Sequence, residues 1–209
     1  MKIFAPAFQL SARLRTALLF FCLLVSHAVS SALLEFDEYL QRADAARTRG
    51  DWESVANQYA QAINHPDLPR DGAMRSRVNL EYGRALGVIC QFAEAEKFLL
   101  RAKDIAEKSQ SPMFSVLYEL GSISVAQKKY SEASAYFVQL LPLMDRDPQA
   151  KNSSLKAADA YEKFAEALAA TGKADEAAVR RADAARVRDS KLKPALPGTI
   201  TPYGAQCPK

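Results

Sequence analysis

Few side chains in this chain of 209 residues could carry out chemistry. The sequence holds two histidines, and one of them, His27, lies in an N-terminal segment that we expect to be removed. A Ser-His-Asp or Cys-His arrangement could therefore use only His65, which is far along the chain from Cys90 and Cys207. Neither cysteine has a second cysteine at metal-ligand spacing, and there is no glycine-rich phosphate loop. We predict no catalytic residue, no bound cofactor and no metal site.

Carboxylates are the abundant reactive groups. Glu162 and Glu166 are four residues apart, so they share one face of a helix, where two close carboxylates can share a proton. Nothing around them in the sequence predicts a buried pocket, and we therefore expect both to be exposed. An enzyme with a cryptic carboxylate site is the least favoured functional hypothesis for this chain. Two carboxylates with raised pKa values in a deep pocket would support this hypothesis.

Cys90 and Cys207 are the cysteines that remain outside the N-terminal segment. They could form a disulfide if the protein is exported to an oxidising compartment. Alternatively, Cys90 packs in a turn between two helices and Cys207 lies free in a tail. The sequence does not choose between these alternatives, and we prefer the second.

One sequence segment occurs four times along the chain, and its structure must position the side chains considered above. The segment RGDWESVANQYAQAI from Arg49 returns as CQFAEAEKFLLRAKDI from Cys90, as KKYSEASAYFVQLL from Lys128 and, more divergently, as GKADEAAVRRADAA from Gly172. A period of about 40 residues indicates a solenoid, in which each unit buries its apolar face against its neighbours. The lead residues of the four copies are Trp52, Phe92, Tyr130 and Ala174.

The spacing around the lead residues predicts an antiparallel helix pair in every unit. Apolar and small residues recur at steps of three and four, which places them on one helix face. Gly83 and Gly121 precede their lead residues by nine positions. Glycine inside a helix needs a packing reason, and we expect contact with the following helix. The predicted first helices span 35–48, 73–88, 112–127 and 154–171, and the predicted second helices span 52–64, 92–108, 130–144 and 174–190.

Several residues predict where these helices begin or end. Gly50 and Gly172 suit left-handed C-terminal caps. Ser111 followed by Pro112 predicts an N-cap and a first helical turn. Pro142 predicts a helix end or a kink.

The small residue, the turn, the aromatic residue and the alanine ladder resemble tetratricopeptide repeats. The resemblance covers residues 35 to 188, and the units are longer than usual, as in the repeats of kinesin light chains. It is best in FAEAEKFLLRAKDI and YSEASAYFVQLL, whereas Val55 replaces an expected alanine and Arg181 stands on the last packing ladder. The resemblance implies an all-α solenoid of about four antiparallel helix pairs in a right-handed superhelix, closed by a polar capping unit. It implies an architecture and no particular activity.

Residues 1–32 have the layout of a secretory signal peptide. A basic start precedes an apolar run at 17–25, and small residues follow. The apolar run is shorter than the about 20 residues of a membrane-spanning helix. An uncleaved membrane anchor is the alternative. Cleavage would fit equally well after Ala28, Ser30 or Ala32.

Removal of this segment changes the charge of the chain. Three of the 28 basic residues leave and none of the 24 acidic ones, so the net charge falls from +4 to 25 − 24 = +1. A role in binding nucleic acid then loses its main support, and a membrane is a partner only if the segment is retained.

The first helices of such a stack line its concave surface, where side chains unused within a unit are candidates for partner binding. Some tetratricopeptide domains bind a C-terminal carboxylate with basic side chains there. The acidic residues at these places predict no such clamp. The mixture of acidic and basic side chains suits a peptide or helix that carries charges of both signs. The alternative is that these are ordinary solvated residues. The candidates are Asp37, Gln41, Asp44, Arg77, Glu81, Arg84, Tyr118, Ser122, Glu162 and Glu166.

The predicted repeat domain covers residues 33–190, and residues 191–209 form a Pro-rich C-terminal tail. Four prolines and two glycines argue against a continued helix in this tail. It is either a disordered tether or an extended segment that lies on the solenoid, and Ile200 and Tyr203 favour docking.

These observations lead to two main functional hypotheses. The first is an exported, periplasmic or secreted, non-enzymatic scaffold that binds a protein or peptide in a cell-envelope or extracellular assembly. The second is a membrane-anchored assembly or secretion factor that keeps residues 1–32. Neither hypothesis names the partner or the oligomeric state.

Overall fold

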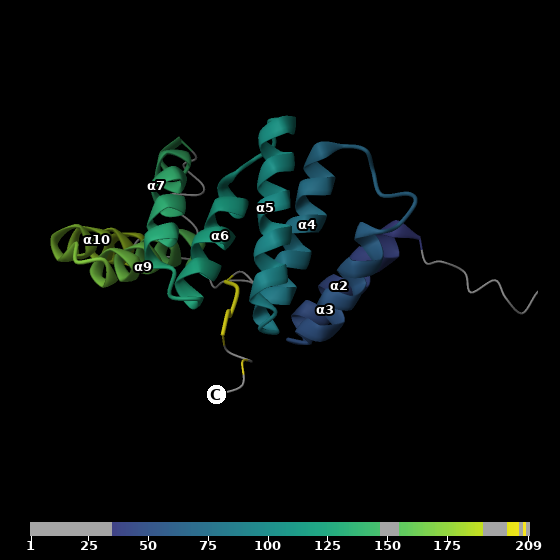
Figure 1. Cartoon of the computed structure of the whole chain (residues 1–209), viewed down its shortest axis with the longest axis horizontal. Helices are drawn as coiled ribbons and strands as arrows, with labels where there is room; N and C mark the ends of the chain where they lie inside the picture. Colours follow the sequence, from purple (N-terminus) through teal and green to yellow (C-terminus); the bar gives the residue numbers. More distant parts are fainter. Residues whose placement is uncertain (1–34, 147–154, 190–199, 205–206, 208–209) are drawn as a thin grey trace, which may run out of the picture. The chain divides into compact units, whose positions relative to one another are not determined.

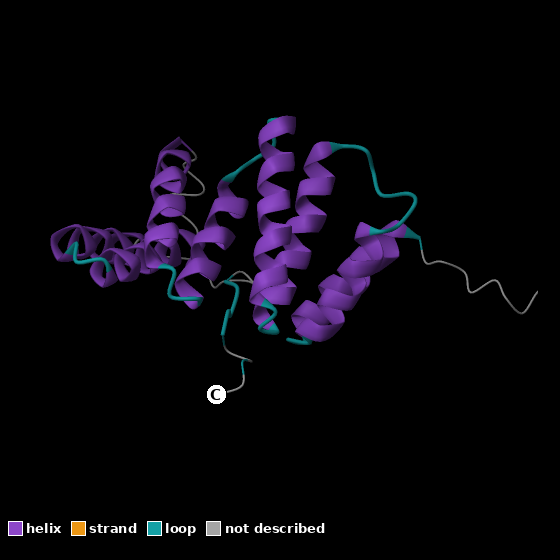
Figure 2. Ribbon diagram, in the orientation of Figure 1, coloured by secondary structure: helices purple, strands orange, loops and turns teal. Residues whose placement is uncertain are grey.

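The computed structural model describes residues 35–146, 155–189, 200–204 and 207, and within these ranges every regular element is a helix (Figure 2). The predicted signal peptide or anchor, residues 1–32, lies outside them. The chain divides into two units, Met1–Glu35 and Phe36–Lys209, and the described helices belong to the second. Among them, none combines the length and the apolar character that crossing a membrane requires.

The described helices form four consecutive pairs (Figure 1). Their bounds lie within two residues of the predicted spans, which confirms the all-α solenoid. The helices are α2 (Phe36–Thr48), α3 (Trp52–Ile63), α4 (Gly72–Val88), α5 (Phe92–Ser109), α6 (Phe114–Ala126), α7 (Tyr130–Arg146), α9 (Leu155–Ala170) and α10 (Ala174–Asp189).

The turns inside the four pairs share one backbone conformation. Gly50, Cys90, Lys128 and Gly172 have φ angles of 74°, 69°, 59° and 81°. The next residue donates its N–H to a carbonyl five positions back, as in the bond from Gln91 to Leu86. This Schellman geometry confirms the caps predicted at the two glycines. Side chains in the left-handed region cost about 1–2 kcal/mol, so the two non-glycine turns carry strain.

Two predicted helix boundaries are wrong. Helix α6 begins two residues after Pro112, because the hydroxyl of Ser111 pairs with Ser109 at 2.7 Å and leaves α6 without a capping side chain. Helix α7 continues through Pro142, so the helix end predicted there is wrong, whereas the alternative, a kink, stays a prediction. The carbonyl that this proline leaves without a helical partner belongs to Val138, and both residues are exposed, so water can reach it.

Two helix glycines allow the paired helices to approach closely, as predicted. A Cβ built on Gly83 would lie 2.8 Å from Leu99 Cγ, and one built on Gly121 would lie 2.7 Å from Phe137 Cζ. Leu99 and Phe137 are both fully buried, so neither side chain can swing into solvent to make room.

We expect Gly121→Ala to destabilise the protein. Overpacking against Phe137 costs about 1–3 kcal/mol, which exceeds the about 1 kcal/mol gained from the better helix propensity of alanine. Urea denaturation followed by circular dichroism measures the difference. The double variant Gly121→Ala/Phe137→Leu should lose less free energy of unfolding than the summed losses of the two single variants. A rise in the free energy of unfolding of Gly121→Ala alone would contradict this packing.

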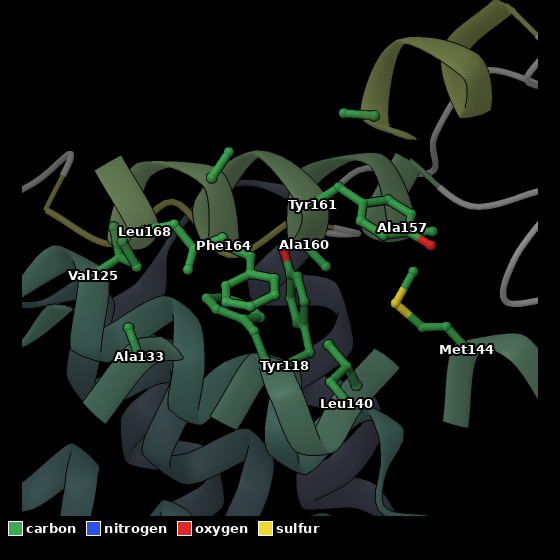
Figure 3. Packing of buried hydrophobic residues seen from close by; sticks show 14 of the residues in the cluster. Tyr118, Val125, Ala133, Leu140, Met144, Ala157, Ala160, Tyr161, Phe164 and Leu168 are labelled. Atoms are coloured by element: carbon green, nitrogen blue, oxygen red, sulfur yellow. The ribbon is translucent and has the colours of Figure 1, made fainter. Parts of the chain in front are cut away.

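Side chains of α6, α7, α9 and α10 form one buried apolar cluster (Figure 3). Phe137 and Phe164 meet with ring centroids 5.7 Å apart, and Tyr118 lies among them. On α10, Ala177 and Ala184 are buried, whereas Arg181 is exposed. The last helix is therefore polar on its outer side, as expected of a terminal capping unit.

Candidate binding surface on the first helices

The structure separates the ten predicted partner-binding residues into two groups. Three are buried: Arg84 is 5% exposed, Tyr118 0% and Ser122 1%. The expectation that these three line an open surface is corrected, because other parts of the chain cover them. The remaining seven are exposed or half-buried, and they are Asp37, Gln41, Asp44, Arg77, Glu81, Glu162 and Glu166.

Charged side chains join the first helices of successive units. Arg47 of α2 lies 2.5 Å from Asp44 and 3.2 Å from Glu81 of α4. Glu81 lies 2.7 Å from Arg84 one turn further along α4. We call the surface that these contacts build the first-helix face. Its members are Asp44, Arg47, Glu81, Arg84, Tyr118, Glu119, Lys156 and Asp159.

Glu119 of α6 is the centre of this face, and its carboxylate is fully buried. Its Oε1 atom lies 3.1 Å from Arg84 Nε and 3.6 Å from Lys156 Nζ of α9. A buried carboxylate costs several kcal/mol unless cations and hydrogen bonds compensate it, and both are present here. Glu119 was not among the residues predicted from the sequence. The signal was a single carboxylate within the otherwise apolar or small residues 116–125.

The guanidinium of Arg84 is charged in this environment. Burial by itself lowers its pKa, but the nearby carboxylates of Glu119 and Glu81 raise the pKa, and the net result lies above the ordinary value. Arg84 therefore keeps its charge and pairs with Glu119 between α4 and α6.

The C-terminal tail is docked on this ion pair, beside α6 in Figure 1, where it is yellow. Thr201 is 2% exposed. Its hydroxyl accepts a hydrogen bond from Arg84 Nε at 2.9 Å and donates one to Glu119 Oε2 at 2.8 Å. The hydroxyl of Tyr203 donates to the same carboxylate oxygen at 3.1 Å. The docking predicted for the tail is confirmed for these residues, and it explains the burial of Arg84.

Gly87 provides the space that the Tyr203 ring occupies. A Cβ at Gly87 would lie 2.4 Å from Tyr203 Cε1 and 3.1 Å from Ile123 Cδ1. Gly87 follows Arg84 by three residues on α4, so the two share a helix face. We call this space the Gly87 notch. A glycine inside a helix costs about 1 kcal/mol relative to alanine, and contact with the tail is its packing reason.

Cys90 and Cys207 are joined by a disulfide. The preferred alternative, two unpaired cysteines, is thereby corrected. The cysteines are 117 residues apart in the sequence, but docking of Thr201 and Tyr203 brings the tail to the turn after α4. The two Cα atoms lie 5.4 Å apart, within the normal range for a disulfide.

Tyr118 links α6 to α9 instead of facing a partner. Its hydroxyl donates to Asp159 Oδ2 at 2.5 Å, and Lys163 pairs with the same carboxylate. The ammonium groups of Lys156 and Lys163 lie 4.8 Å and 5.4 Å from the centroid of its ring, within cation–π range. Tyr118 therefore contributes to the contact between units three and four.

The other residues considered for chemistry are separated. Glu162 pairs with Arg188 of α10, whereas Glu166 is exposed, so the two form no shared buried carboxylate site. His65 is buried, with its ring centroid 6.2 Å and 5.8 Å from those of Phe36 and Tyr39. Within the described ranges no three His, Cys, Asp or Glu residues are grouped so that they could hold a metal ion.

The buried Tyr118 and the half-buried Tyr203 make the stability of this face depend on pH. Burial, with the neighbouring Glu119 carboxylate, raises the pKa of Tyr118 and Tyr203 above the ordinary value of about 10. The folded protein thus favours the neutral phenols. Their contribution to the free energy of unfolding is complete below pH 10 and is lost as the pH rises towards the folded-state pKa values.

We expect the contribution of these two tyrosines to the free energy of unfolding to be constant up to about pH 10 and to fall at higher pH. Urea denaturation at increasing pH measures it, and the absorbance of tyrosinate reports ionisation. Tyr203→Phe should make the free energy of unfolding fall less steeply with pH. Ionisation of an exposed tyrosine would not change the free energy of unfolding. Ionisation of every tyrosine near pH 10 without loss of structure would contradict the prediction.

No family model and no curated protein sequence matches the chain. Among solved structures it is similar to a Podosopora anserina protein described as a kinesin light chain with nearly identical TPR-like repeats. The TM-score is 0.58 at 16% identity, over 87% of this chain and 89% of that one. It is also similar to MamA, with a TM-score of 0.59 at 14% identity over 89% and 98% of the two chains. The chain therefore has the fold of a tetratricopeptide-like repeat solenoid.

Proposed function

We propose that this protein is an exported, non-enzymatic scaffold that binds a short peptide segment of another protein in a cell-envelope or extracellular assembly. The observation that carries the proposal is the docked tail. Residues 200–204 have no regular secondary structure, and their side chains hydrogen-bond to α4 and α6. The first-helix face thus has the chemistry to bind a peptide.

Two observations support export. A disulfide between Cys90 and Cys207 is stable in an oxidising compartment and is rare in the cytosol. Residues 1–32 have the layout of a secretory signal. The alternative, a membrane-anchored factor, shares the disulfide and differs only in keeping this N-terminal segment.

The separation of the reactive side chains supports a non-enzymatic role. His65 is packed against rings, and Glu162 and Glu166 do not converge. The buried carboxylate of Glu119 is already engaged by Arg84, Thr201 and Tyr203, and it therefore serves as a structural acceptor rather than a general base.

Site-specific photo-crosslinking in the native cell tests the binding surface. A photoreactive residue at Arg77, exposed on α4, should form an adduct with a partner, whereas one at Arg101, exposed on α5, should form none. Adducts at both positions, or at Arg101 alone, would place the partner elsewhere.

The intact mass of the native protein tests export separately. A chain that starts after Ala28, Ser30 or Ala32 supports the exported scaffold. A chain that retains residues 1–32 and fractionates with membranes supports the anchored alternative.

A further inference from the structure

We infer that the Arg84–Glu119 pair and the Gly87 notch form a binding site for an uncharged peptide that turns tightly at one residue and carries hydroxyl side chains on the two residues beside it. The chain's own segment Thr201-Pro202-Tyr203 fills this site as a tethered internal ligand, and a partner binds by displacing it. The inference deepens the proposed function, on which it rests for the existence of a partner.

The hydroxyl spacing follows from the geometry at Glu119. One carboxylate oxygen, Oε2, accepts from both Thr201 and Tyr203, at 2.8 Å and 3.1 Å. The Thr201 hydroxyl also accepts from Arg84 Nε, so it bridges both members of the ion pair. The backbone N–H of Tyr203 donates to the Thr201 carbonyl at 3.0 Å, so the segment turns tightly at Pro202, and this turn brings both hydroxyls to one carboxylate.

The charges on the first-helix face indicate an uncharged ligand. The contacts named above pair three cations with three carboxylates, and Lys163 pairs with the fourth carboxylate, Asp159, which leaves no net charge to attract a charged side chain. A charged group placed there would be desolvated without a counterion. The described tail segment, residues 200–204, reads ITPYG and has no charged residue. The paired charges are Arg47, Arg84 and Lys156 with Asp44, Glu81 and Glu119.

The Gly87 notch selects an aromatic ring at the second position. Its walls are the α4 backbone and Ile123, and the Tyr203 ring fills the volume that a Cβ would take. The notch and Glu119 together accept a ring with a hydroxyl at its far end. Tyrosine has this shape, whereas phenylalanine would fill the notch and leave the carboxylate with one donor fewer.

The way the tail is attached makes its displacement by a partner possible. Ile200, Pro202 and Gly204 are exposed, so the docked segment contacts the helices mainly through Thr201 and Tyr203. A competing peptide can replace the contacts that these two hydroxyls and the Tyr203 ring make. The disulfide holds the segment near its site and raises its effective concentration, which keeps the site occupied when no partner is present.

Peptide binding in trans tests this inference directly. The probe is a fluorescent synthetic peptide with residues 197–206 of this chain, PGTITPYGAQ, which contains neither cysteine nor charge. The protein is the full chain with its disulfide intact, either unchanged or carrying Thr201→Ala/Tyr203→Ala. The double variant should bind the probe at least about tenfold more tightly than the unchanged protein, because its own tail no longer competes.

Two controls separate the site from general effects of the substitutions. Adding Gly87→Ala to the double variant fills the notch and should weaken probe binding at least about tenfold, since the ring loses its place. A probe with alanine in place of Thr201 and Tyr203 should not bind. Circular dichroism and urea denaturation show that each variant is folded, and Cys207→Ser provides a second way to free the site if the double variant does not fold.

Each outcome decides the inference. Tight binding that depends on Gly87 supports the site. Failure of a folded double variant to bind the probe, or equal binding by the unchanged protein, would overturn it. Because these measurements need no cellular partner, they can fail while crosslinking at Arg77 succeeds, which would leave the scaffold proposal intact and place its ligand elsewhere.

Discussion

Glu119→Ala is expected to lower the free energy of unfolding by up to about 5 kcal/mol, because it breaks a buried ion pair and leaves Arg84 with Glu81 as the remaining carboxylate of the two named above. The substitution also removes the acceptor shared by Thr201 and Tyr203. These two hydroxyls can rotate to water if the tail leaves, but Arg84 cannot leave the helix interface so easily. The buried cation therefore accounts for most of the expected loss.

Urea denaturation measures this effect, with circular dichroism as the signal. Fluorescence of Trp52 provides a second signal, since it is the only tryptophan in the sequence and is buried in the first helix pair. The matched control is Glu94→Ala, which removes an exposed carboxylate paired with Lys97 and should change stability by about 0–1 kcal/mol. Equal losses in the two variants would show that Glu119 is no more than a surface charge.

The repeat predicted the architecture well because its signals are local. The steps of three and four around the lead residues depend on helix geometry alone, and Gly83 and Gly121 were interpreted from one fact, that glycine in a helix needs a packing reason. Pro142 was misjudged for a tertiary reason. The carbonyl it deprives of a partner is exposed, and the sequence does not show that exposure.

The binding surface was harder to predict because it depends on contacts between distant segments. Arg84 was correctly placed on a first helix. Its burial was not predicted, because Thr201, which covers it, lies 117 positions away in the sequence. Glu119 was overlooked because the repeat pattern directed attention to exposed polar residues rather than to a carboxylate among apolar ones. The Cys90–Cys207 pairing follows from the same docking, which no local spacing encodes.

Loss of the disulfide is the second large effect that we expect. Cys207→Ser should lower the free energy of unfolding by up to about 5 kcal/mol, because the bond closes a loop of 117 residues and restricts the unfolded chain. The full loss requires that the tail stays docked in the reduced native state. If the tail detaches, the native chain also gains freedom, and the measured loss is smaller by the entropy of that release.

Cys90→Gly provides the comparison that isolates the disulfide from the backbone. Both substitutions remove the bond, but glycine also relieves the positive φ of 69° at this turn. Cys90→Gly should therefore be more stable than Cys207→Ser by up to about 1 kcal/mol. Lys128→Gly, at the equivalent turn with φ of 59°, should show the same gain without involving any cysteine.

The three variants together test how the tail and the turn are coupled. Non-reducing urea denaturation gives each free energy of unfolding, and the same measurement in excess dithiothreitol should remove the difference between the unchanged protein and Cys207→Ser. A loss of about 5 kcal/mol in Cys207→Ser would mean that Thr201 and Tyr203 hold the tail in place without the bond. A loss below about 1 kcal/mol, with Lys128→Gly behaving as expected, would mean that the disulfide contributes mainly by keeping the tail near its site.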